Sequence, residues 1–189
     1  MEQVAKFSAN YRLNFDVELP AAGGGFRIFA HSPATPHGCD GPLIRIESKS
    51  GIPWLACFCK GFKSGDVADA AYTTPNPDVA CVISNGAGYW VNTLERDATN
   101  VPVFPIRQVE CTHHLLLFAD FTNIAAFGSN GPLWVSDRLV WENLIINTVD
   151  ENNGRVLCQG WNPLAARDVE VIVDLQTGRA ITGRLPNIK

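Results

Sequence analysis

Short apolar runs separated by turn-forming residues fill the stretch from His114 to Trp161, and they constrain the fold more than any other feature. Each run has three or four residues and is followed by Asn, Gly, Ser, Asp or a similar turn former. This punctuation is typical of β-strands joined by tight turns. None of the runs reaches the roughly 10 to 12 residues at which a buried helix becomes the better interpretation. We therefore expect antiparallel strands here.

Asn-Gly pairs predict where these strands turn back. Asn130-Gly131 and Asn153-Gly154 lie between apolar runs, and Asn85-Gly86 lies between Val79–Ser84 and Tyr89–Asn92. A type I′ turn needs positive φ at both central residues, which Asn and Gly reach at low cost. Each pair therefore predicts a hairpin.

Strict alternation of apolar and polar residues from Tyr11 to Leu19 predicts one further strand with a single buried face. Residues 60–77 have no clear period and are expected to form a long loop, with one helical turn around 66–71. Residues 94–105 are expected to form a polar connection. The chain closes with a predicted hairpin of Val169–Leu175 and Ala180–Leu185.

These segments amount to about 12 to 14 strands of ordinary length and no helix. The predicted fold is a single all-β domain over residues 1–189, an antiparallel β-sandwich or barrel built of hairpins. Two similar hairpins, 80–93 and 115–129, leave open a small propeller-like array of four-stranded units. If the chain has halves, 1–78 and 79–189, we expect them to pack as one unit.

Composition narrows the function classes. The net charge of −4 argues against nucleic acid or an anionic membrane as the partner, because both attract basic surfaces. Charged residues make up only 18% of the chain, below the usual level of about 25%. A protein partner, a small ligand or a homo-oligomer is therefore expected to cover part of the surface.

No secretory signal or membrane span is visible, so we expect a cytoplasmic protein of bacterial type. Six cysteines are present, and most lie within apolar runs. In a chain of this size, which does not need disulfides for stability, buried thiols are the favoured interpretation.

Catalytic candidates lie in the loop from His31 to Pro42. His37, Cys39 and Asp40 supply a base, a nucleophile and a carboxylate, the residue types that nucleophilic catalysis needs. Known triads, however, assemble from separate elements of a fold. A plain polar loop is therefore the favoured interpretation, and a small hydrolase is the alternative.

Two further groups of residues could carry chemistry. Cys57 and Cys59 with His113-His114 have the residue types of a zinc site, but two buried thiols explain the cysteine pair more simply, so no metal or other cofactor is expected. Carboxylates near strand ends could serve a glycosidase-like site if two of them faced one cleft; they are Asp120, Asp137, Glu142 and Asp174.

Tryptophans supply the candidate binding residues. Trp141 and Trp161 are each followed by polar residues or proline and are expected at the surface, where Trp can stack on a sugar or anchor a protein interface. His31 is a third candidate for ligand contact. The sequence thus predicts a binding or protein-interaction module rather than an enzyme, with a structural subunit of a homo-oligomer as a further alternative.

Overall fold

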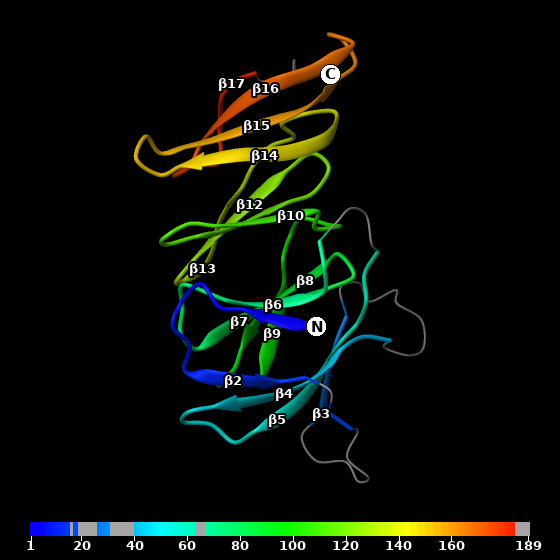
Figure 1. Ribbon diagram of the computed structural model, residues 1–189, viewed down its shortest axis with the longest axis vertical. Helices are drawn as coiled ribbons and strands as arrows, with labels where there is room; N and C mark the ends of the chain where they lie inside the picture. Colours follow the sequence, from blue (N-terminus) through cyan, green and yellow to red (C-terminus); the bar gives the residue numbers. More distant parts are fainter. Residues whose placement is uncertain (16, 19–25, 31–39, 63–66, 184–189) are drawn as a thin grey trace. The chain divides into compact units, whose positions relative to one another are not determined.

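The computed structural model describes residues 1–15, 17–18, 26–30, 40–62 and 67–183 (Figure 1). In these ranges the chain forms 17 strands in four mostly antiparallel sheets and no helix. The strand order of each sheet is linear, so none of these sheets closes into a barrel. The predicted all-β fold of hairpins is therefore confirmed in its open, sandwich-like form. The chain divides into two compact units, Met1–Pro105 and Ile106–Lys189.

The first unit contains a five-stranded sheet of order β1-β6-β7-β8-β9 and a four-stranded sheet of order β2-β4-β5-β3. The pairs β1 with β6 and β3 with β5 are parallel, and the other pairs are antiparallel. The strands are β1 (Glu2–Val4), β2 (Tyr11–Asn14), β3 (Phe26–Phe29), β4 (Leu43–Ser48), β5 (Trp54–Phe58), β6 (Ala70–Thr73), β7 (Val79–Ser84), β8 (Ala87–Asn92) and β9 (Asp97–Asn100).

One buried cluster joins the two sheets of this unit, with apolar residues of β2, β4 and β5 against those of β6, β7 and β8. The hydroxyl groups of the two tyrosines in this cluster make hydrogen bonds to backbone carbonyls. The Tyr11 hydroxyl donates to the carbonyl of Val79 at 3.2 Å, and the Tyr89 hydroxyl donates to that of Cys59 at 2.6 Å. A buried hydroxyl without such an acceptor would destabilise the core.

The second unit contains two four-stranded sheets in which every strand pairs with its sequence neighbour, antiparallel throughout. Figure 1 shows the second of these sheets in yellow to red. The strands are β10 (Gln108–Cys111), β11 (Leu116–Ala119), β12 (Ile124–Gly128), β13 (Gly131–Val135), β14 (Glu142–Asp150), β15 (Arg155–Asn162), β16 (Arg167–Asp174) and β17 (Ala180–Thr182).

A second buried cluster joins these two sheets. It consists of Leu117, Ala119, Ile124, Ala126, Leu139, Val140, Leu144, Ile146, Val156, Cys158, Val171 and Val173. In β15 and β16 the members of this cluster stand at alternate positions, as expected for strands that bury one face. The other face of the β14–β17 sheet is left outside this core.

Gln108 provides a polar link between the same two sheets. Its side-chain Nε2 donates to the carbonyl of Ile146 at 2.8 Å, and its Oε1 accepts from the Ile146 amide at 2.8 Å. The side-chain amide of β10 thus satisfies both backbone groups of one residue of β14. A strand in that position would make the same pair of bonds.

All three hairpins predicted from Asn-Gly pairs form, but only Asn85-Gly86 occupies the two-residue turn that its sequence predicts. Ser84 and Ala87 are paired, and Asn85 and Gly86 between them have φ of 48° and 82°. Gly154 also has positive φ, 64°, in the turn from β14 to β15. At the β12–β13 turn the register differs by one residue from the prediction, because Gly128 pairs with Gly131 and leaves Ser129 and Asn130 at the turn.

Three strands escape the sequence analysis. β1 is absent from the prediction, β9 lies in the expected polar connection 94–105, and β6 lies where a loop with a helical turn was expected. The helical turn is wrong for the described part of 66–71, because Ala70 and Ala71 are buried members of β6. The boundary between the two units lies between Pro105 and Ile106, and the strands on either side of residue 78, β6 and β7, are paired.

Candidate functional site

The candidate site is the side of the β14–β17 sheet that faces away from the second core, hereafter the outer face. Cross-strand partners in an antiparallel sheet point to the same side, and the name is used for the three rows that the register places nearest to Trp161, leaving out the row of Asp150, Arg155 and Asp174 at the other end. The three rows are Thr148, Leu157, Ile172 and Thr182; Ile145, Gln159 and Glu170; and Glu142, Trp161 and Asp168. Every member is exposed or half-buried.

Apolar side chains on this face are unusually open to solvent. Ile145 is 43% exposed, Leu157 38% and Trp161 36%. The three belong to adjacent strands whose backbone positions are fixed by the ladder. An exposed apolar group on a rigid scaffold can bind a partner with little loss of conformational entropy.

Two register shifts in β14 assemble the outer face. Glu142, Ile145 and Thr148 are spaced by three residues, so a regular strand would place Ile145 opposite to the other two. The pairing slips between Glu142 and Ile145 and again between Ile146 and Thr148, and all three therefore face outward. Asn143, at the first slip, has a φ of 56°, a conformation that Asn adopts more easily than most residues. Bulges of this kind often lie beside functional sites.

The structure brings the two predicted surface tryptophans together. The Trp141 amide donates to the Trp161 carbonyl at 2.9 Å, and both residues are exposed as expected. The Arg138 guanidinium lies 4.5 Å from the centre of the Trp141 ring, and its nitrogens donate to the carbonyls of Val140 and Trp141. Trp141 therefore already carries a cation on its ring.

Gly160 holds the strand of Trp161 close to the core. A Cβ atom at this position would lie 2.6 Å from Cγ2 of Val140, a buried residue. Only glycine allows this approach of backbone to side chain. The packing fixes β15 directly behind the Trp161 side chain.

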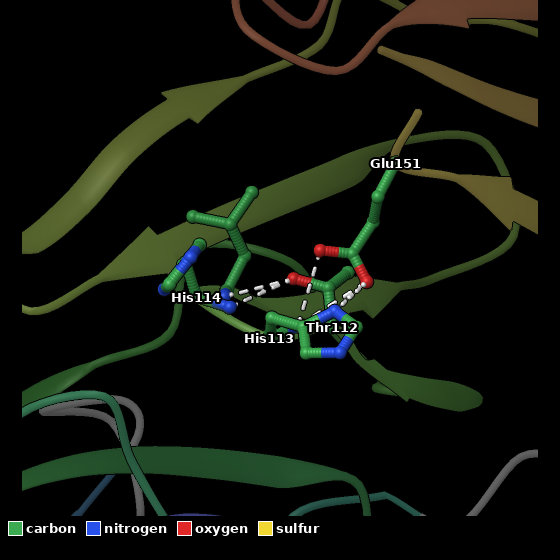
Figure 2. Close-up of polar contacts among 5 residues, drawn as sticks. Thr112, His113, His114 and Glu151 are labelled. Atoms are coloured by element: carbon green, nitrogen blue, oxygen red, sulfur yellow. Dashed lines mark hydrogen bonds and ion pairs between the residues drawn. The ribbon is translucent and has the colours of Figure 1, made fainter. Parts of the chain in front are cut away.

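A second polar group lies where the β10–β11 turn meets the β14–β15 turn (Figure 2). The His113 ring Nδ1 lies 2.9 Å from Glu151 Oε1, and the His113 amide donates to the same carboxylate. Thr112 Oγ1 accepts from the amides of His114 and Leu115. The group thus ties two turns of the second unit together.

Partial desolvation raises the pKa of the Glu151 carboxyl, but hydrogen bonds from the side chain and backbone of His113 outweigh it, so the pKa is lowered overall. The His113 side chain is 85% exposed. A histidine paired with a carboxylate could act as a base if a nucleophile lay on the other side of the ring. The Thr112 hydroxyl instead accepts backbone hydrogen bonds, so this contact has the features of a turn-stabilising ion pair.

The loop candidates fall mostly outside the described residues. His31, His37 and Cys39 lie in the ranges that the structure does not describe. Asp40 is described, and its carboxylate pairs with Lys60 Nζ at 3.1 Å, with 92% of its side chain exposed. An exposed surface pair is a weak interaction. The catalytic reading of this loop remains a prediction.

Two of the carboxylates considered for glycoside hydrolysis close turns. Asp120 Oδ1 accepts from the amides of Thr122 and Asn123, and Asp174 Oδ1 accepts from those of Gln176 and Thr177. Hydrogen bonds from Thr177 lower the pKa of Asp174. Both side chains have a structural role that follows from turn chemistry.

The cysteines depart from the expectation in one place. Cys59 is disulfide-bonded, so the prediction of a thiol is wrong there, and a Cys2His zinc site that uses it is also wrong, because a disulfide sulfur is no thiolate ligand. Cys57, Cys81, Cys111 and Cys158 carry thiols. Burial raises the pKa of Cys158 to about 12, which makes that thiol a poor nucleophile.

Among the described residues, no three His, Cys, Asp or Glu side chains gather as metal ligands would. The same residues contain no helix that is long and apolar enough to cross a membrane.

Sequence analysis finds Trp161 but not its surroundings. The sequence does not indicate that Ile145 and Glu142 share a face with Trp161, because the two bulges in β14 that turn both residues to this side have no sequence signal except Asn143. Comparison with known proteins adds no assignment: no protein family matches the chain, and no curated protein is significantly similar to it.

Proposed function

We propose that this protein is a protein-interaction module and that the outer face of the β14–β17 sheet is its binding surface. The observation that carries the proposal is the group of exposed apolar side chains, Ile145, Leu157 and Trp161, one in each of the three rows on the adjacent strands β14 and β15. Monomeric proteins seldom leave such side chains together on a rigid sheet unless a partner covers them. Trp is also the residue most enriched among the anchors of protein interfaces.

The dimensions of the face favour a short segment of a partner protein. Three rows of side chains about 7 Å apart extend over roughly 14 Å, and four strands about 4.8 Å apart extend over another 14 Å or so. This area is well below the roughly 800 Å² that each partner contributes to a standard interface. An extended peptide of about five residues would cover it.

Selection of peptides from a random library displayed on phage tests this function. Leu157→Asp places a charge on the outer face in the inner strand β15, whereas Ile52→Asp changes a residue of the first unit that is 71% exposed and serves as the matched control. We expect peptides that bind the wild type and Ile52→Asp but not Leu157→Asp. Selection that yields no binders, or binders that Leu157→Asp retains, would contradict the proposal.

A further inference from the structure

Trp161 on the outer face stands between two carboxylates. Its cross-strand partner in β14 is Glu142, and its partner in β16 is Asp168. The Cβ atoms of such partners lie about 5 Å apart, so the indole is flanked on both sides. Glu170 follows two residues after Asp168 and faces the same way.

No hydrogen bond or ion pair within the described residues engages the carboxylates of Glu142, Asp168 or Glu170. Arg167 is next to Asp168, but it pairs with Asn162 and so points to the other side of the sheet. Arg155 points to the same side as Trp161 but is six residues away along β15, in a row with its register partners Asp150 and Asp174. Among the described residues, the part of the outer face around Trp161 is therefore acidic without a compensating cation.

The same sheet shows how a tryptophan of this protein accommodates a cation. Arg138 lies over the ring of Trp141, where its guanidinium is 4.5 Å from the ring centre. No cation of the described residues lies over the ring of Trp161, although this ring has two carboxylates beside it. An arginine from outside could stack on the indole and pair with a carboxylate at the same time, since guanidinium groups favour both contacts.

We propose that the occupant of the outer face is a basic segment of a partner protein, with an arginine side chain on the Trp161 ring between Glu142 and Asp168. Apolar residues of the segment then contact Ile145, Leu157 and the half-buried Ile172. The inference rests on the proposed function, because it names the chemistry of the partner that this surface binds. Charge complementarity selects the partner, and apolar contact holds it.

The probe is a synthetic heptapeptide, Thr-Leu-Thr-Arg-Thr-Leu-Thr, in which the central arginine and the two leucines point to the same side of an extended chain. Its analogues carry citrulline, lysine or glutamate at the centre, and binding is measured by calorimetry at low and at physiological salt. We expect the arginine peptide to bind about tenfold more tightly than the citrulline peptide, a ratio that corresponds to about 1.4 kcal/mol. Affinity for the arginine peptide should also fall as salt rises.

Two variants locate the arginine. The double substitution Glu142→Gln and Asp168→Asn should abolish the preference for arginine over citrulline, and Trp161→Leu should reduce it while keeping apolar contact. Circular dichroism verifies that each variant is folded. Glu95→Gln, which removes an exposed carboxylate from the first unit, is the matched control and should keep the full preference.

The outcomes separate this inference from the function on which it rests. Equal binding of the arginine, citrulline and glutamate peptides would overturn the cationic partner while leaving a peptide-binding surface. Failure of the arginine peptide to bind at all would overturn the inference, and the phage selection would then decide the function independently. A wild-type dimer in sedimentation that Leu157→Asp converts to monomer would show a second copy on the face and would also overturn it.

Discussion

Replacement of Gln108 by methionine tests the polar link between the two sheets of the second unit. Methionine has nearly the shape of glutamine but makes neither bond to the backbone of Ile146, which are both 2.8 Å long. An unsatisfied buried amide or carbonyl costs about 1–3 kcal/mol. Because the Gln108 and Ile146 contact is only partly buried, water can recover part of this loss. We expect a net destabilisation of about 2 kcal/mol, the lower end of the range for two groups.

The assay combines thermal unfolding with hydrogen exchange of individual amides. For a chain of this size, about 2 kcal/mol corresponds to a decrease in the midpoint of about 4–8 °C, and the Ile146 amide should exchange markedly faster. Gln159→Met is the matched control, because Gln159 lies half-buried on the outer face with no hydrogen bond to its side chain in the described residues. Equal midpoints for the wild type and Gln108→Met, with unchanged exchange at Ile146, would refute the reasoning.

Three further substitutions or measurements test other contacts of the second unit. Gly160→Ala should destabilise the protein by about 1–3 kcal/mol through overpacking against Val140, and Val140→Ala in the same chain should restore part of that loss in a double-mutant cycle of denaturation midpoints. The pKa of Glu151 measured by NMR should lie below that of an ordinary glutamate and should rise in His113→Ala. Since the folded pKa is lowered, the contribution of Glu151 to stability is present above the unfolded pKa and is lost as pH falls through the folded pKa. An unchanged Glu151 titration midpoint in His113→Ala would contradict the interaction with His113. The Cys158 thiol, with its pKa raised to about 12 by burial, should resist iodoacetamide at pH 8 until the protein unfolds, and rapid alkylation of the native protein would contradict its burial.

The elements that the sequence predicts well are those in which a local rule decides the structure. Asn85-Gly86 forms its turn because few other residue pairs adopt positive φ at both positions. The strand predicted over Tyr11–Leu19 forms only over Tyr11–Asn14, where two buried residues alternate with polar ones. In both places the identity of residues adjacent in the sequence is enough to predict the local backbone conformation.

Strands that depend on distant partners escape such rules. Ala70 and Ala71 have a composition that fits a loop or a helical turn, and they form β6 because β1 and β7 pair with them on either side. The outer face shows the same limit. The polar neighbours of Trp161 in the sequence indicate that it is exposed. That Ile145 lies on the same face depends on the bulges in β14, which only the pairing with β15 reveals.

The alternation in β15 and β16 separates two tasks along one piece of chain. Val156, Cys158 and Val171 belong to the buried core, while the residues between them form the outer face, the proposed binding surface. Substitutions at the outward positions can therefore change what is recognised without disturbing how the chain folds. A lineage of such proteins could keep one core and acquire new specificities at the intervening positions, and the same property makes this sheet a scaffold on which recognition can be redesigned.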